Sequence, residues 1–118
     1  MVSLSFEEGL QAFQREEYYE AHEIWEELWS DPALADRRIL QGFIQVAVSV
    51  FHAYQGNLKG ARSMVAKALS KWESAPALWH RISMPEFIQS AQHWAEHLHY
   101  VNHIEEVDFS RTPKVRTV

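Results

Sequence analysis

The chain has 118 residues, a formal net charge of −5 and no cysteine. That length is enough for one domain with a core of its own, and the absence of cysteine excludes disulfides and thiolate metal ligands. The acidic balance argues against a nucleic-acid partner, because binding to phosphates requires clustered Lys and Arg.

At the N-terminus, Met1–Leu10 has neither the basic nor the apolar region of a signal peptide, so we expect a cytoplasmic protein without one. Ser5-Phe6-Glu7-Glu8 is a capping-box pattern, which is typical of a helix that begins here. Leu10 and Phe13 are then expected to point toward the core.

A second helix is predicted for residues 18–29, which are rich in aromatic and acidic side chains and precede Ser30-Asp31-Pro32. At about 100° per residue, Trp25 lies on its apolar face, and His22 and Glu26 lie one turn apart on the flank of that face. With Glu23 they form an HExxE-like motif, in which Glu replaces the second His of the zinc-protease signature. Such a pair is either structural or part of a site.

A third helix is predicted from Leu34 or Asp36 to Gln55, with Gly56 as its left-handed end. Polar residues interrupt its uncharged stretch, so we interpret it as a buried helix of a soluble protein and expect no membrane partner. Apolar residues cover most of its circumference. The remaining stripe, about 100° wide, holds amide, hydroxyl and imidazole groups: Gln41, Gly42, Gln45, Ser49 and His52.

This stripe has three possible roles. Buried amides without partners cost about 1–3 kcal/mol each, so an internal network with His22 and Glu26 is one reading. A functional pocket is the second, and a solvated face is the third. His22, Glu26 and His52 would also form a ligand set for Zn or Fe(II), so a divalent metal is an alternative to the absence of any cofactor.

The remaining chain also indicates helices. Asn57 caps a predicted fourth helix that continues to Trp72, and Ala77–Ile82 is expected to form one short helical segment. Ser83-Met84-Pro85-Glu86 is a second capping box with a proline in the first turn. No segment shows a sustained alternation of period two, so we predict no strand.

From Phe87 to Val101 the apolar residues recur with a helical period, and four histidines lie on the opposite, solvated face. We therefore predict an all-α fold: a compact bundle of five to six helices, built from two antiparallel helical hairpins and a C-terminal helix. A faint repeat, in which residues 13–29 align with 53–69, supports the two hairpins. The domain is expected to comprise residues 1–118, with a helical body (1–104) and an extended tail (105–118).

The motifs Ala21-His22-Glu23-x-Trp25-Glu26-x-x-Trp29, Gln41-Gly42-x-Ile44-Gln45 and Gly56-Asn57-x-x-Gly60-Ala61 resemble those of a known family. It is the group of small all-helical proteins catalogued as domain of unknown function 309. The resemblance extends from about Phe6 to Leu69 and implies a compact helical array, but no established activity. The residues that match its signature are His22, Glu23, Glu26, Trp29, Gln41, Gln45 and His52.

These residues are the candidate pocket, and we expect it to bind a small polar ligand or a side chain of a protein partner. The alternative is a metal-assisted hydrolase in which Glu26 or His52 is the base. A purely structural role of the polar cluster is the third reading. Whether the chain is an enzyme stays open at this point, as do its ligand, its partner and its oligomeric state.

Overall fold

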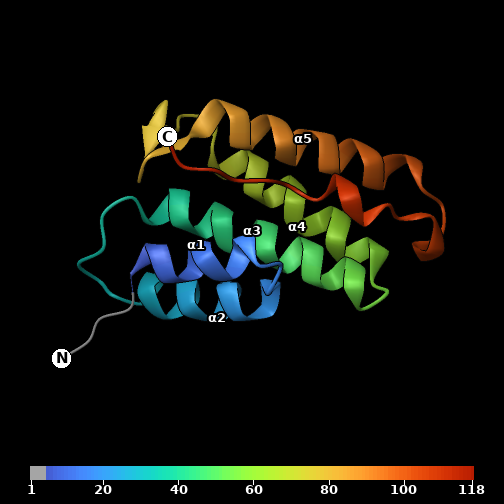
Figure 1. The fold of residues 1–118 in the computed structure, drawn as a ribbon, viewed down its shortest axis with the longest axis horizontal. Helices are drawn as coiled ribbons and strands as arrows, with labels where there is room; N and C mark the ends of the chain where they lie inside the picture. The colour runs from blue at the N-terminus through green and yellow to red at the C-terminus, as the bar shows by residue number, and fades with distance from the viewer. Residues whose placement is uncertain (1–4) are drawn as a thin grey trace.

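Five α-helices make up most of residues 5–118, which is the part of the chain that the structure, a computed structural model, describes (Figure 1). The predicted all-α class is thus confirmed, while residues 1–4 of the predicted domain lie outside the described part. Each helix packs against the next one along the chain. The elements are α1 (Phe6–Gln14), α2 (Tyr18–Trp29), α3 (Arg37–Tyr54), α4 (Leu58–Lys71), β1 (Leu78–Trp79), β2 (Ile82–Ser83), α5 (Met84–Tyr100) and the 3-10 helices η1 (Ile104–Glu106) and η2 (Phe109–Arg111).

Local sequence determines where several helices begin and end. The side chain of Ser5 accepts a hydrogen bond from the amide of Glu8 at 3.4 Å, and that of Asn57 accepts one from Gly60 at 2.9 Å. Both residues therefore cap helices, as predicted. Gly56 has a φ of 81° after α3, which is the left-handed conformation expected of it. The short turn at Gly56 and Asn57 places α3 beside α4.

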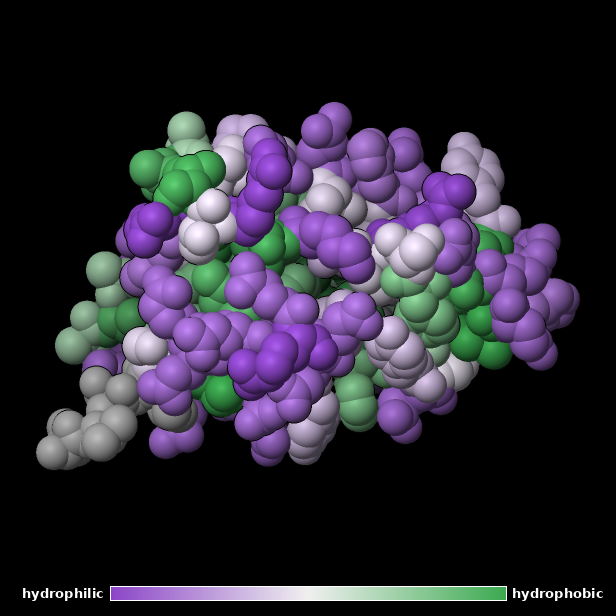
Figure 2. Space-filling view, in the orientation of Figure 1, coloured by the Kyte–Doolittle hydropathy of each residue, from purple (hydrophilic) through white to green (hydrophobic). Residues whose placement is uncertain are grey.

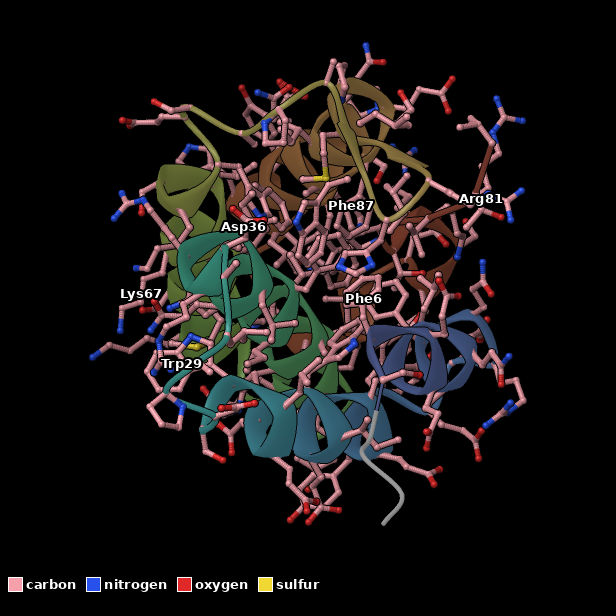
Figure 3. All side chains as sticks on the ribbon, turned by 90° about the vertical axis from the view of Figure 1, so that its left-hand side faces the viewer. Phe6, Trp29, Asp36, Lys67, Arg81 and Phe87 are labelled. Carbon is pink, nitrogen blue, oxygen red and sulfur yellow. The ribbon has the colours of Figure 1, made fainter. Side chains whose placement is uncertain are left out.

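Aromatic side chains form the centre of the core, where the rings of Phe43 and Phe87 stack with their centroids 4.8 Å apart. Phe6 contacts Phe43 edge to face at 5.1 Å, and in Figure 3 both Phe6 and Phe87 point toward the middle of the molecule. Trp25 is fully buried, as its place on the apolar face of the second helix predicted. Trp94 is fully buried in the same way on α5. Aromatic stacking thus joins helices that are far apart in the sequence.

The segment between α4 and α5 contradicts two predictions. Ala77–Ile82 is not helical, because β1 and β2 form an antiparallel pair in which Trp79 is opposite Ile82. His80 and Arg81 turn the chain between these strands with φ values of 49° and 63°. Two successive left-handed residues form a tight hairpin turn and cannot continue a right-handed helix. The predicted absence of strands is therefore wrong at this one hairpin of residues 5–118.

The C-terminal tail returns along the helices and ends beside the hairpin (Figure 1). The side-chain amide of Gln14 donates to the carbonyl of Val115 at 3.1 Å, and the amide of Val118 donates to the carbonyl of Arg81 at 2.7 Å. Figure 2 shows that the face which carries the tail is mostly hydrophilic, with hydrophobic residues visible in patches. Ser90 of α5 also forms hydrogen bonds with the backbone of Lys114 at 3.3 Å. The tail thus connects α1, α5 and the hairpin, although it contributes few regular elements.

Lowering the pH is expected to loosen the tail at His97. Its Nε2 accepts a hydrogen bond from the amide of Asp108 at 2.8 Å, which only the neutral imidazole can do. Burial, together with the charge of Arg111, lowers the pKa of His97 below its ordinary value, while the charge of Asp108 opposes this shift. The folded state thus favours the neutral form. Its stabilising contribution is complete above the ordinary pKa of about 6.5 and is lost as the pH falls through the lower, folded value.

The protection factor of the Asp108 amide, which compares its exchange with that of an unstructured peptide at the same pH, checks this expectation. Measured from pH 8 down to pH 5, it should fall toward the acidic end. In His97→Gln the amide oxygen can accept the same bond and does not titrate, so the protection factor of the Asp108 amide should lose this pH dependence. His99→Gln removes an exposed imidazole from the same helix and serves as the control. A pH dependence that persists in His97→Gln would contradict the assignment.

None of the helices that residues 5–118 form combines the length and the apolar character that a membrane crossing requires.

Candidate functional site

A groove of about 570 Å³ lies between α2, α3 and α4. Each of these helices contributes side chains to it, and five of the eight lining residues belong to the predicted candidate set. The lining residues are His22, Glu26 and Trp29 from α2, Gln41, Ile44, Gln45 and Val48 from α3, and Met64 from α4. We call this hollow the α2–α4 groove.

The α3 wall of the groove combines two amides with two aliphatic side chains. Gln41 and Gln45 are four residues apart and therefore share one face of the helix. The Oε1 atom of Gln45 is buried and has no hydrogen-bond partner among residues 5–118. A buried carbonyl oxygen in this state costs about 1–3 kcal/mol. It is therefore a buried acceptor of this wall that folding leaves without a bond among residues 5–118.

The α2 wall carries the acidic and aromatic groups. His22 Nε2 lies 3.2 Å from Glu26 Oε1, and His22 Nδ1 lies 3.3 Å from the carbonyl oxygen of Tyr19. The side chain of His22 is 19% exposed and that of Glu26 is 58% exposed, so the carboxylate lies at the mouth of the groove. The imidazole thus lies between two oxygen acceptors, to one of which its neutral form can donate, and its carboxylate partner remains accessible to solvent.

Trp29 forms the end of the same wall. Its Nε1 donates to the carbonyl of Arg37 at 3.0 Å, and the guanidinium of Arg37 lies over its ring at 4.1 Å from the centroid. In Figure 3, Trp29 lies at the edge of the molecule on the same side as Lys67 of α4. These contacts fix the indole in position, so the wall does not need a ligand to form.

The structure does not place Glu23 and His52 with the others. Glu23 is exposed and does not line the groove. His52 lies at the end of α3, where its Nδ1 is 3.4 Å from Nδ2 of Asn57. Among residues 5–118 no three His, Cys, Asp or Glu side chains are grouped so that they could hold a metal ion. His22, Glu26 and His52 therefore do not form the three-ligand set that the sequence offered as an alternative to the absence of a cofactor.

The other two members of the polar stripe serve the packing of α3. Ser49 is fully buried, donates to the carbonyl of Ala61 at 2.7 Å and accepts from Nε1 of Trp94 at 3.0 Å. It thus links α3 to α4 and α5. Gly42 is buried against the indole of Trp72. The stripe is therefore divided: Ser49 and Gly42 are structural, whereas Gln41 and Gln45 face the groove.

Sequence reasoning missed three apolar lining residues. Ile44 and Val48 are three residues beyond Gln41 and Gln45, so helical spacing alone places each beside an amide. This signal was present, but an apolar residue on a central helix is normally assigned to the core. Met64 is brought to the groove by the packing of α4 on α3, which no local pattern reveals.

Comparison with known proteins identifies the same family that the sequence motifs resemble. Residues 6–64 match the family described as "Domain of unknown function (DUF309)". Over 54 residues the chain is 41% identical to "Uncharacterized protein YpuF" of Bacillus subtilis (strain 168), a stretch that covers 45% of this chain and 31% of that protein. No solved structure matches the chain significantly. The family match extends over half of the chain, from α1 into α4 and across all of the groove, so the chain belongs to the DUF309 family.

Proposed function

We propose that the α2–α4 groove is a binding site for a hydrogen-bond donor on an apolar stem, carried by a small ligand or by a side chain of a protein partner. The observation that carries this proposal is the buried Oε1 atom of Gln45, which has no hydrogen-bond partner among residues 5–118. A donor from outside would give this oxygen the bond that the chain does not supply.

The chemistry of the walls supports this class of ligand. Glu26 offers a carboxylate at the mouth and Gln45 a carbonyl oxygen in the wall, and both groups accept hydrogen bonds. Ile44, Val48 and Met64 offer an aliphatic surface to a stem. An ammonium, guanidinium or amide group on a short alkyl chain combines both requirements. A carboxylate would instead meet two acceptors and be repelled.

Burial of the acceptor also explains why such a ligand would gain affinity. The cost of desolvating the Gln45 oxygen has already been incurred when the chain folds, so a donor that reaches it gains a bond at little further cost to the protein. The groove walls are fixed by the Trp29–Arg37 and His22–Glu26 contacts, which limits the ordering that binding requires.

Three probes of equal length test the proposal: n-butylammonium, butyramide and butyrate, titrated into the 15N-labelled protein at millimolar concentration. We expect the first two probes to shift the side-chain amide of Gln45 and the indole N–H of Trp29, and butyrate to shift neither. If butyrate bound as well as the others, or if the shifts lay elsewhere, the proposal would be wrong.

Gln45→Met is the matching variant, because it keeps the length and the flexibility of the side chain but removes the acceptor. We expect it to weaken butyramide binding about tenfold, which corresponds to about 1.4 kcal/mol, while stability stays equal or increases because an unpaired polar atom has been removed. Gln89→Met changes an exposed glutamine of α5 and is the control. Marked destabilisation of Gln45→Met with unchanged binding would instead support a structural role.

A further inference from the structure

A second hollow, also of about 570 Å³, lies where the first turn of α2 meets the last turn of α3. It shares no lining residue with the α2–α4 groove. Four of its lining residues are aromatic, namely Tyr18, Tyr19, Phe51 and Tyr54. We call it the aromatic groove.

Two aromatic side chains of this groove remain largely exposed to solvent and are not needed to fill the core. Tyr19 is 50% exposed and Tyr54 is 49% exposed, which makes them two of the five large hydrophobic residues that residues 5–118 leave exposed. Tyr19 packs on Phe51 with centroids 5.0 Å apart, and Tyr54 stacks on Phe109 at 4.1 Å. The rings are thus held rigidly while part of their surface remains free.

The charge around these rings has one sign. Glu16, Glu17 and Glu20 complete the lining, and no Lys or Arg belongs to it. Of these three carboxylates, only Glu17 has a salt-bridge partner among residues 5–118, and that partner is Arg15. Glu16 is held by the turn after α1, where its φ is 64°, and burial together with its charge raises the pKa of Tyr54. The groove therefore presents aromatic faces beside three carboxylates, of which Glu16 and Glu20 have no salt-bridge partner among residues 5–118.

This combination matches the guanidinium of arginine. A planar cation stacks on an aromatic face and forms hydrogen bonds with carboxylates from its edges at the same time. The protein already uses the first of these contacts, because Arg37 lies over the ring of Trp29. A partner with an acidic or purely aliphatic surface would leave Glu16 and Glu20 unpaired.

We propose that the aromatic groove docks an arginine side chain from an exposed segment of a partner protein, with the guanidinium on the ring of Tyr19 or Tyr54 and beside Glu16 or Glu20. The inference is independent of the function proposed for the α2–α4 groove, because the two sites have different lining residues and different tests.

The probe is an acetylated and amidated Gly-Arg-Gly-Arg-Gly peptide, compared with its twin in which citrulline replaces each arginine. Citrulline keeps the shape and most hydrogen-bond donors of arginine but has no charge. We expect the arginine peptide to shift the ring resonances of Tyr19 and Tyr54, to bind about tenfold more tightly than its twin, and to weaken as salt is raised. Equal binding of the two peptides would overturn the proposal.

Two variants localise the contact. Tyr19→Leu keeps the apolar bulk but removes the ring, and Glu20→Gln removes one charge; each is expected to weaken binding about two- to fivefold, and both together about tenfold. Tyr100→Leu and Glu73→Gln make the same changes at exposed positions outside the groove and should bind as the wild type does. Peptide shifts at Gln45 and Trp29, or self-association that masks the groove, would also refute the proposal.

Discussion

Trp25→Ala is expected to lower the free energy of unfolding by about 3–5 kcal/mol, the usual cost of truncating a buried tryptophan. The side chain is fully buried, and its Nε1 donates to the carbonyl of Phe6 at 3.1 Å. Its ring stacks on Phe6 at 5.3 Å and contacts Phe43 edge to face at 5.5 Å. Truncation therefore leaves a large cavity between α1, α2 and α3 and an unpaired carbonyl beside it.

Urea denaturation, followed by circular dichroism, measures this loss as a lower midpoint. Tyr100→Ala is the control, because Tyr100 is 80% exposed and its truncation should change stability by no more than about 0.5 kcal/mol. If Trp25→Ala is already unfolded without urea, Trp25→Phe takes its place, because it keeps part of the stacking. Its midpoint should be measurable and lower than that of the wild type. A wild-type midpoint for Trp25→Ala would show that the indole does not support the core.

The sequence predicts most of the helical fold because the relevant signals are local. The period that places Trp25 on an apolar face, and the cap at Asn57, both depend on neighbours within one or two turns. The hairpin after α4 has no such signal. Its turn residues, His80 and Arg81, adopt a left-handed backbone conformation. Neither is the Gly or Asn that is typical of such a turn, so the sequence does not indicate it. Tertiary contacts, including the bridge from Ile82 to Thr117, stabilise the hairpin instead.

The candidate site could be predicted only in part. Helical spacing places His22 beside Glu26 and Gln41 beside Gln45, and the packing of α2 on α3 brings the two pairs to one groove. His52 is seven residues beyond Gln45 and so lies on nearly the same face of the helix, but it is about 10 Å further along the axis. The spacing pattern gives the direction of a side chain correctly. It does not indicate where along α3 the groove ends.

Gly42→Ala is expected to destabilise the protein by about 1–3 kcal/mol, the usual range for overpacking. Alanine normally stabilises the interior of a helix by up to about 1 kcal/mol relative to glycine. Here a Cβ atom would overlap the indole of Trp72, which is 3% exposed and whose Nε1 donates to the carbonyl of Ile39 at 3.1 Å. The indole would have to move and weaken that bond, so the sign of the substitution is reversed.

A double-mutant cycle with Trp72→Leu separates this clash from the helix preference of alanine. Trp72→Leu is itself destabilising, but it leaves room for the new Cβ atom beside α3. In that background we expect Gly42→Ala to be neutral or stabilising, because only the propensity gain remains. If Gly42→Ala cost the same in both backgrounds, the close approach of α3 to Trp72 could not be the reason for glycine at this position. The measured coupling therefore tests directly whether glycine is required here by the neighbouring indole and not by the backbone of α3.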